Sequence, residues 1–540
     1  MTQTIASLTA DSLISNGVTS LYCVPGIQND HFFNALFDRQ DQIQAIHTRH
    51  EQGAVYMALG AALATGQPQA FSIVPGPGFL NGCAALCTAY ALNAPLFGVI
   101  GQIPSGAIGK GLGLLHEIEN QFEILSSLCK HSDRIIDGDQ AQHQLADAWR
   151  ALRSERPRPV GIEIPVDKWL IETNYTTAQL LVEKSDHRSI DGKQITRAAE
   201  LITAAKCPLI AVGSGAQTES DNIRRLADSI SAGVMAFRTG HGVMDSRESL
   251  SIPMPVGHKL WRECDLIIGL GTRLITQKKD WGIDNKIKIL HIDIDSATLG
   301  KVTPATVGIN ADLKDVLPAL IESLPDQPKR ENWRNTIAET KSVFHTEIDR
   351  ELKPQLEWLQ AIRNAIPEDG IFVDELTQIG YVSRFAFQSF QPRTFLSTGY
   401  QGTLGYGIAT ALGAAHARPD VPVVSITGDG GAMFTITELA TAVHHNIPVN
   451  IVVMNDNAFG NVKGIQRDKY DARYIASELS SPDFVKLAES MGVSADKAAS
   501  PVDLEHKLKT AIANPGPNLI EVSVGEFPSP WKYILLPKAR

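Results

Sequence analysis

Residues 428–460 contain side chains whose types and spacing suit the binding of a metal ion and a phosphate group. Asp429 lies in a Gly-Asp-Gly-Gly turn, and the consecutive residues Asn455, Asp456 and Asn457 follow near the end of the stretch. Mg²⁺ prefers oxygen ligands of this kind and usually shares them with substrate phosphates. Glycines in the turn let backbone N–H groups come close to a phosphate. The pattern therefore predicts a site for Mg²⁺ and a diphosphate, with two ordinary polar loops as the alternative.

The segments around these residues must bring them to one edge of a sheet. Residues 421–427 and 447–454 are apolar and rich in β-branched side chains, which predicts two buried parallel strands. Between them, apolar residues recur at helical spacing over 434–445, so we expect the turn at Asp429 to open a helix whose N-terminus favours an anion. Open α/β sheets bind ligands at the carboxyl ends of their strands, where both parts of the predicted site lie.

The whole segment resembles the thiamine diphosphate motif of the acetolactate synthase and pyruvate decarboxylase superfamily. In that family the first Asp of the motif binds the metal, which implies Asp429. A second side-chain ligand lies 27 residues later, where this chain has Asp456 instead of the usual Asn, and a backbone carbonyl two residues further on implies Ala458. Other thiamine enzymes use the last residue of an Asn-Asp-Asn, which leaves Asn457 as the competing ligand. We favour Asp456, because the spacing through Phe459 and Gly460 then matches that of acetolactate synthases without a gap.

The resemblance also implies a catalytic glutamate in a different domain. Residues 47–67 contain Arg-His-Glu-Gln-Gly-Ala at the start of a small-residue helix, which resembles the family's glutamate segment and assigns this role to Glu51. In the family this carboxyl group exchanges a proton with the aminopyrimidine ring, whose imino form then removes the thiazolium C2 proton. The alternative for Glu51 is a charged residue at a helix N-terminus without a catalytic role.

Two further segments resemble parts of the family's cofactor site. Residues 397–407 are similar to the segment that hydrogen-bonds the aminopyrimidine and places a bulky side chain under the cofactor, and residues 374–380 are similar to the loop that holds the diphosphate. Either segment could instead be a tight turn without a ligand. The resemblance implies a cofactor-binding set of Thr377, Gln378, Gly402, Leu404, Gly428, Asp429, Gly430, Gly431, Asp456 and Asn457.

Composition and charge indicate a large soluble enzyme. The chain has 540 residues, 43% of them hydrophobic and 20% charged, which is enough for about three domains with a core each. The net charge of −10 is spread without blocks, so we expect neither nucleic acid nor a membrane as a partner. We find no signal peptide and no stretch of transmembrane length. The six cysteines lie far apart except Cys83 and Cys87, which fits reduced thiols in a cytoplasmic protein.

Alternating strand and helix patterns predict an α/β fold of three consecutive doubly wound domains with mainly parallel sheets. Polar or proline-bearing segments at 186–192 and 326–333 suggest linkers. By resemblance, the domains are a pyrimidine-binding domain (1–185), a middle Rossmann-like domain (190–325) and a diphosphate-binding domain (345–530). The family's cofactor lies between the first domain of one subunit and the third of another. A homodimer is therefore the minimum assembly, and we expect a homotetramer.

The middle domain could hold a second cofactor, because residues 209–215 and 266–273 each end a predicted strand with glycines. Acetolactate synthases bind FAD here with a longer loop that contains Gly-Met-His-Gly. Residues 249–263 are shorter than that loop and lack this sequence. We therefore expect no FAD and assign the glycines to helix–sheet packing.

Residues expected to face the cofactor indicate the type of reaction. Pyruvate decarboxylases carry a His-His pair where this chain has Ala-Leu-Asn-Ala-Pro at 91–95, and simple decarboxylases carry an acidic residue in place of Ile27. Both differences favour carbon–carbon ligation or lysis over plain decarboxylation. Residues 101–121 resemble an acetolactate synthase loop, in which His116 and Glu117 take the place of a Gln-Glu pair.

His116 is the candidate proton shuttle, because an imidazole titrates near neutral pH. Gln28 and His31, after the first predicted strand, are candidate substrate contacts. Each of the three could instead be a surface or packing residue.

We therefore expect a thiamine diphosphate- and Mg²⁺-dependent carboligase or lyase for a 2-oxo acid or acyloin-type substrate. As in acetolactate synthases, the resemblance implies a reaction through a C2 ylid and an enamine. The alternatives are a simple 2-oxo acid decarboxylase, an FAD-containing 2-oxo acid oxidase and a catalytically degenerate homologue that binds the cofactor and has a regulatory role.

Overall fold

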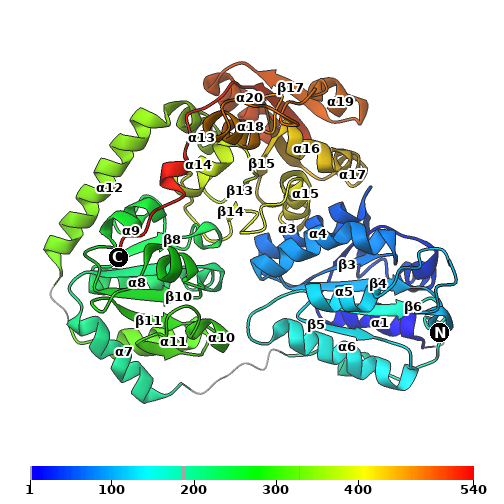
Figure 1. Cartoon of the computed structure of the whole chain (residues 1–540). Helices are drawn as coiled ribbons and strands as arrows, with labels where there is room; N and C mark the ends of the chain where they lie inside the picture. Colours follow the sequence, from blue (N-terminus) through cyan, green and yellow to red (C-terminus); the bar gives the residue numbers. More distant parts are fainter. Residues whose placement is uncertain (1–2, 184–189, 327–328) are drawn as a thin grey trace.

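The computed structural model describes residues 3–183, 190–326 and 329–540, which form three six-stranded sheets flanked by helices (Figure 1). Every strand pair within these sheets is parallel. The predicted α/β fold is therefore confirmed. No helix in the described ranges is long and apolar enough to span a bilayer.

The first sheet has the strand order β2-β1-β3-β4-β6-β5. Its order reverses between β1 and β3, so the loops after these two strands open onto a shared crevice. The strands are β1 (Ser20–Cys23), β2 (Gln44–His47), β3 (Gln69–Ile73), β4 (Leu96–Gln102), β5 (His131–Arg134) and β6 (Val160–Pro165). The helices are α1 (Ile5–Ser15), α2 (Asp30–Phe37), α3 (Glu51–Thr65), α4 (Pro77–Leu92), α5 (Gln121–Leu128) and α6 (Gly138–Arg153).

The middle sheet has the order β12-β11-β10-β7-β8-β9, the strand order of dinucleotide-binding domains. Its strands are β7 (Pro208–Val212), β8 (Gly233–Ala236), β9 (Ser251–Ile252), β10 (Leu266–Leu270), β11 (Lys288–Ile292) and β12 (Val307–Ile309). Its helices are α7 (Gly192–Ala204), α8 (Ser220–Ile230), α9 (Met254–Leu260), α10 (Ser296–Leu299) and α11 (Leu313–Glu322). The long helix α12 (Glu331–Glu351) then leads to the third sheet (Figure 1).

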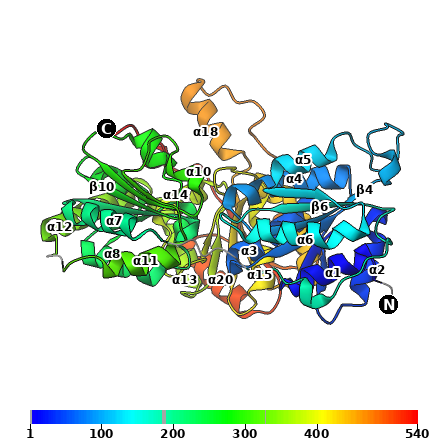
Figure 2. The same cartoon turned by 90° about the horizontal axis from the view of Figure 1, so that it is seen from below.

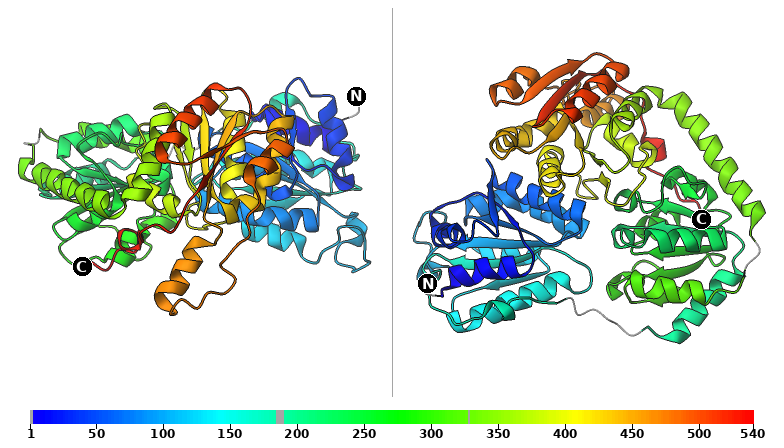
Figure 3. Two further views of the ribbon diagram at one scale, coloured as in Figure 1. Left: turned by 90° about the horizontal axis from the view of Figure 1, so that it is seen from above. Right: turned by 180° about the vertical axis from the view of Figure 1, so that it is seen from behind.

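The third sheet, β14-β13-β15-β16-β18-β17, repeats the order of the first, and its order reverses between β13 and β15. Its strands are β13 (Ile371–Val373), β14 (Phe395–Leu396), β15 (Val423–Gly428), β16 (Val449–Asn455), β17 (Ser494–Ala498) and β18 (Asn518–Ser523). Its helices are α13 (Lys353–Ala365), α14 (Gln378–Ala386), α15 (Tyr406–Ala417), α16 (Asp429–Thr435), α17 (Leu439–His444), α18 (Gly460–Lys469), α19 (Phe484–Ser490) and α20 (Pro501–Ala513). Helix α18 projects from the molecule as an arm (Figures 2 and 3).

Two local predictions differ from the structure, and a third falls mostly outside the described residues. The turn at Asp429 opens a helix as expected, but a 3-10 turn at Ile436–Glu438 divides this helix into α16 and α17. Most of the segment at 186–192 lies outside the described residues. In the segment at 326–333, residues 327–328 also lie outside, but Glu331 starts α12 because Trp333 packs into the middle domain, where its Nε1 donates to the Pro208 carbonyl at 3.0 Å.

Helices α3 and α15 cross in direct backbone contact and join the cores of the first and third sheets (Figures 1 and 2). Both helices are made mostly of small, buried residues. A Cβ atom added at Gly60 would collide with the Thr410 carbonyl group, and one added at Gly413 would collide with that of Met57. Glycine is therefore required at both positions, although it lowers helix propensity.

The substitution Gly413→Ala should destabilise the protein by about 1–3 kcal/mol, because the methyl group forces the helices apart. Gly464→Ala, in α18, is the matched control, because its Cβ meets nothing within 4 Å. Alanine there should be neutral or stabilise by up to about 1 kcal/mol. Urea unfolding followed by circular dichroism compares the variants; equal midpoints for both would contradict the close packing.

Candidate active site

The carboxyl ends of β13, β15 and β16 enclose a cavity of about 220 Å³. Thr377 caps α14 and its Oγ1 accepts from the Gly380 N–H at 2.8 Å, while Gln378 Nε2 donates to Asp456 Oδ2 at 2.6 Å. Adjacent strand ends thus bring together most of the predicted cofactor set. The predicted residues that line the cavity are Thr377, Gln378, Leu404, Gly428, Asp429, Gly430, Gly431, Asp456 and Ala458.

Two carboxyl groups face each other in this cavity. Asp429 is 1% exposed, and Ser481 Oγ donates to its Oδ2 at 2.5 Å. Burial, together with the negative charge of Asp429, raises the pKa of Asp456 to about 6. A cation between the two groups would remove this repulsion. The donor set therefore fits a hard divalent cation such as Mg²⁺.

The Asn-Asp-Asn cluster separates in space. Asn455 Nδ2 donates to Glu521 at 2.9 Å, and Asn457 Oδ1 accepts from the Ser481 N–H at 3.3 Å. Asp456 is the member of the cluster that lines the cavity. Next to it, Ala458 pairs with Glu478 in an antiparallel β-bridge. The two hydrogen bonds of this bridge are made by the backbone groups of neighbouring residues, so they do not use the Ala458 carbonyl.

Glycine at two turns keeps the backbone close to the cavity. A Cβ at Gly430 would lie 2.7 Å from the Phe459 ring, so a larger residue would push this aromatic wall away. Gly402 has a φ of +61°, in the left-handed region, and its nearest neighbour would be the Leu376 side chain at 3.6 Å. Gly402 lies near Leu376, which lines the cavity, but does not line the cavity itself, whereas Leu404 does.

Glu51 lies elsewhere, at the first position of α3. Asn81 Nδ2 donates to Glu51 Oε2 at 2.9 Å, and a Cβ at Gly78 would lie 3.1 Å from Glu51 Oε1. The backbone before it is anchored by Glu438, which accepts from the N–H groups of Arg49 and His50. Glu51 is thus half-buried, with Asn81 at one carboxyl oxygen and Gly78 beside the other. These contacts limit the directions in which the carboxyl group can point.

His116 and Gln28 meet at the reversal point of the first sheet. His116 Nδ1 and Gln28 Oε1 lie 3.0 Å apart, and Gln28 Nε2 donates to the Leu115 carbonyl at 3.3 Å. His31 lies exposed on α2, and the structure does not bring it into this pair. Glu117 instead accepts from backbone N–H groups in its own loop.

The turn at residues 75–78 connects Glu51 with His116. Gly76, with a φ of +63°, packs against the His116 carbonyl, and its N–H donates to Gln121 Oε1 at 2.8 Å. Gly78 lies against Glu51 on the other side of the turn. The two predicted catalytic residues therefore lie on one structural unit, separate from the cavity at Asp429.

The chain matches three domains of one protein family over most of its length. These are the N-terminal TPP binding domain of thiamine pyrophosphate enzymes (residues 3–125), the central domain (195–320) and the C-terminal TPP binding domain (378–522). The chain belongs to the thiamine pyrophosphate enzyme family. Within it, the chain resembles acetolactate synthases.

The relatives of this thiamine pyrophosphate enzyme include synthases and a decarboxylase. It is 30% identical to the acetolactate synthase isozyme 1 large subunit of Escherichia coli, over 95% of this chain and 92% of the relative. It is 32% identical to a probable acetolactate synthase large subunit of Methanocaldococcus jannaschii, over 95% and 90%. A probable 2-ketoarginine decarboxylase of Pseudomonas aeruginosa is 28% identical, over 94% and 92%.

The middle domain of this thiamine pyrophosphate enzyme borders a larger cavity, of about 940 Å³. Both predicted glycine turns line it, and Gly215 packs directly on Gly271. Arg238 and Arg273 line it too, and burial lowers the pKa of Arg238 to about 10. The glycines therefore serve backbone packing and also border the cavity; the expectation that FAD does not bind stays a prediction.

Several polar residues of the site did not emerge from sequence motifs. Asn81, Gln121 and Ser481 each hold a predicted residue or its turn from a distant part of the chain. Glu375 is completely buried below the glycine loops, where its Oε1 accepts from the Gly405 N–H at 2.5 Å. The sequence signal that could have identified Glu375 is its position just after the apolar strand at Ile371–Val373.

Glu375 should make the stability of the protein depend on pH. Burial, with a smaller contribution from the charge of Asp374, raises its pKa to about 7 from an ordinary 4.5. The folded state then binds more protons than the unfolded state between these pH values, so stability falls as pH rises from about 4.5 to above 7, by on the order of 3 kcal/mol.

Urea midpoints measured from pH 5 to pH 8 should therefore decline less for Glu375→Gln than for the wild type. Glu331→Gln, at an exposed glutamate of α12, should keep the wild-type decline. The same decline in Glu375→Gln and wild type would refute the role of this carboxyl group.

Proposed function

We propose that this protein is a thiamine diphosphate- and Mg²⁺-dependent carboligase or lyase that acts on a 2-oxo acid or an acyloin-type compound, as acetolactate synthases do. The observation that carries the proposal is the facing pair Asp429 and Asp456 in a glycine-lined cavity at three strand ends. Such a pair needs a cation, and the glycine turn beside it offers backbone N–H groups to a diphosphate.

Residues of the third domain would hold the cofactor. Asp429, Asp456 and the Ala458 carbonyl would bind Mg²⁺, and the backbone at 428–431 with Thr377 and Gln378 would hold the diphosphate. Leu404 would support the cofactor from below, with Gly402 beside the aminopyrimidine. The bound cofactor supplies a carbon nucleophile that can accept the electrons released when a 2-oxo acid loses CO2.

Glu51 would act on the cofactor of a second copy of the chain. The residues that line the cavity at Asp429 all come from 376–527, and Glu51 is not among them. A homodimer in which the first domain of one subunit covers this cavity in the other would complete the site, and a homotetramer is the expected assembly. Glu51 would then exchange a proton with the aminopyrimidine, held in position by Asn81.

Ile27, in place of the acidic residue of simple decarboxylases, favours ligation or lysis, and His116 and Gln28 are the candidate proton shuttle and substrate contact beside it. Their side chains meet at a strand-order reversal on the same unit as Glu51, so they would face the substrate beside the cofactor. Ile27 is exposed at this point, and an apolar residue cannot deliver the proton that a simple decarboxylase adds. His31 is a weaker candidate because it lies on the exposed side of α2.

A simple 2-oxo acid decarboxylase is the second candidate, because one relative is named a probable 2-ketoarginine decarboxylase. The cavity beside the middle domain keeps an FAD-containing oxidase as a further alternative. The presence of both Glu51 and the Asp429–Asp456 pair argues against a degenerate regulatory homologue. The six cysteines are unpaired, which supports a cytoplasmic location.

Mass spectrometry of products from a panel of 2-oxo acids, with and without added aldehyde, tests the type of reaction. A carboligase forms a carbon–carbon product that contains the added acceptor. Release of the simple aldehyde as the single product would establish the decarboxylase instead, and a visible spectrum of the same sample would detect flavin.

Glu51→Gln should lower kcat by at least about 100-fold, because the amide cannot exchange a proton with the aminopyrimidine. Thiamine diphosphate binding should remain nearly unchanged. Glu331→Gln is the matched control, because Glu331 also begins a helix but lies on an exposed part of α12. Steady-state kinetics and calorimetry measure both quantities; full activity in Glu51→Gln would refute the assigned role.

The identity of the second side-chain ligand can be decided by Mg²⁺ titration. Asp456→Ala should raise the Mg²⁺ concentration needed for half-maximal cofactor binding at least about tenfold, because a charged ligand is lost. Asn457→Gly should have a smaller effect, and glycine tolerates the φ of +53° at this position. A larger effect of Asn457→Gly would make Asn457 the ligand.

A further inference from the structure

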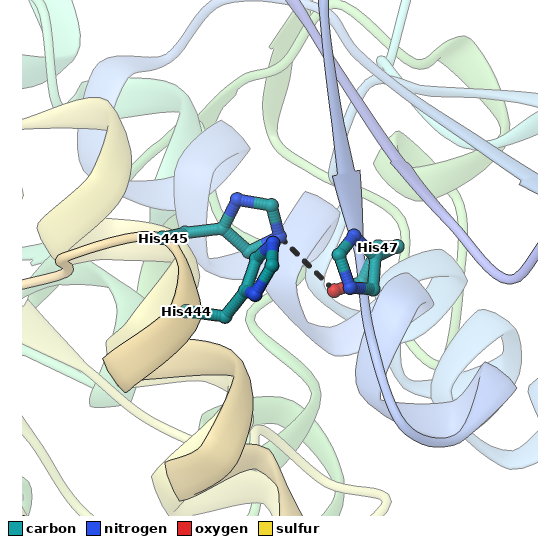
Figure 4. A group of neighbouring side chains, drawn as sticks. All are labelled: His47, His444 and His445. Carbon is teal, nitrogen blue, oxygen red and sulfur yellow. Dashed lines mark hydrogen bonds between the residues drawn. The ribbon is translucent and has the colours of Figure 1, made fainter. Parts of the chain in front are cut away.

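Three imidazole side chains meet where the first and third domains touch (Figure 4). His47 is the last residue of β2, His444 is the last residue of α17, and His445 follows directly. One ring nitrogen from each lies within 4.8 Å of those of the other two. None of the three residues lines the cavity at Asp429 or the larger cavity beside the middle domain.

The rings of this histidine cluster pack edge to face. The ring centroids of His47 lie 4.5 Å from His444 and 4.8 Å from His445, and those of His444 and His445 are 4.8 Å apart. His445 Nε2 also donates to the His47 carbonyl at 3.2 Å (Figure 4). This bond fixes the position of one imidazole relative to the strand that carries another.

Burial favours the uncharged form of two of the three imidazoles, those of His47 and His445. Burial lowers the pKa of His47, with smaller contributions from the charges of His444 and Arg49. Burial and the charges of His47, His444 and His416 lower the pKa of His445 to about 4. A neutral imidazole has a free lone pair, which is the form that binds metals.

We propose that His47, His444 and His445 form a binding site for one borderline divalent cation of the Zn²⁺ type, separate from the Mg²⁺ expected at Asp429. Zn²⁺ is bound by imidazole nitrogens at about 2.0–2.1 Å, which places tetrahedral ligands roughly 3.3 Å apart. His444 is exposed, so its side chain can rotate to close the remaining gap, and a water molecule can supply a fourth ligand. Mg²⁺ prefers oxygen ligands and does not compete for this site.

The cation would tie the first domain to the third within one chain. His47 belongs to the first sheet, whereas His444 and His445 end a helix of the third domain. Glu438, just before that helix, already accepts from the N–H groups of Arg49 and His50. A bound cation would therefore reinforce the same contact four residues before Glu51.

A Zn²⁺ titration of the holoenzyme tests the site. The protein is stripped of trace metals, saturated with Mg²⁺ and thiamine diphosphate, and titrated against a chelating dye. The wild type should bind one Zn²⁺ per chain at least tenfold more tightly than His444→Gln or His445→Gln. Its unfolding temperature should rise with free Zn²⁺, and that of His444→Gln should not.

His506→Gln is the control, because His506 is an exposed histidine on α20 outside the cluster. It should bind Zn²⁺ as the wild type does. Co²⁺ in place of Zn²⁺ should give visible absorption bands of a four-coordinate site in the wild type and not in His444→Gln. Equal Zn²⁺ affinity in the wild type and His444→Gln, or no binding by the wild type at micromolar Zn²⁺, would overturn the proposal and leave ring packing as the role of the cluster.

Discussion

The backbone contact between α3 and α15 sets the positions of both halves of the candidate site. Gly60 and Gly413 allow these helices to touch, and each helix begins next to a functional segment. Glu51 starts α3, and the loop with Gly402 and Leu404 leads into α15. A shared core between the first and third sheets follows from this crossing, so the two domains are packed directly on each other within a chain.

The buried acidic groups divide into two kinds. Glu375 and Glu438 accept N–H groups of their own chain, so their charge supports the glycine loop and the segment before Glu51. Asp429 and Asp456 instead face each other, and each gains one side-chain donor. Like charges that face each other at a strand edge call for a ligand that neutralises them.

Hydrophobic patterns along the chain were enough to predict the fold class and the strands that carry the site. The strands predicted at 421–427 and 447–454 match β15 and β16 to within about two residues at each end, because buried parallel strands are continuous apolar runs. The helix that opens at Asp429 was also expected, but its division by the 3-10 turn at Ile436–Glu438 was not, since the apolar periodicity continues through that turn.

Side-chain direction could not be predicted in the same way. Asn455, Asp456 and Asn457 are consecutive, and only the bonds to Glu521 and Ser481 show that two of them turn away from the cavity. Asn81 and Gln121 lie 30 and 45 residues from the groups that they hold, so no local pattern links them.

The claim that the first domain of one chain completes the cavity of another is tested most directly with mixed subunits. Glu51→Gln and Asp429→Ala should each be inactive alone. Co-expression with two affinity tags lets the heterodimer be isolated, and activity should reappear because one of its sites has both native residues; in a random mixture this is about a quarter of all sites. An isolated heterodimer without activity would contradict the claim and place both residues in one chain's site.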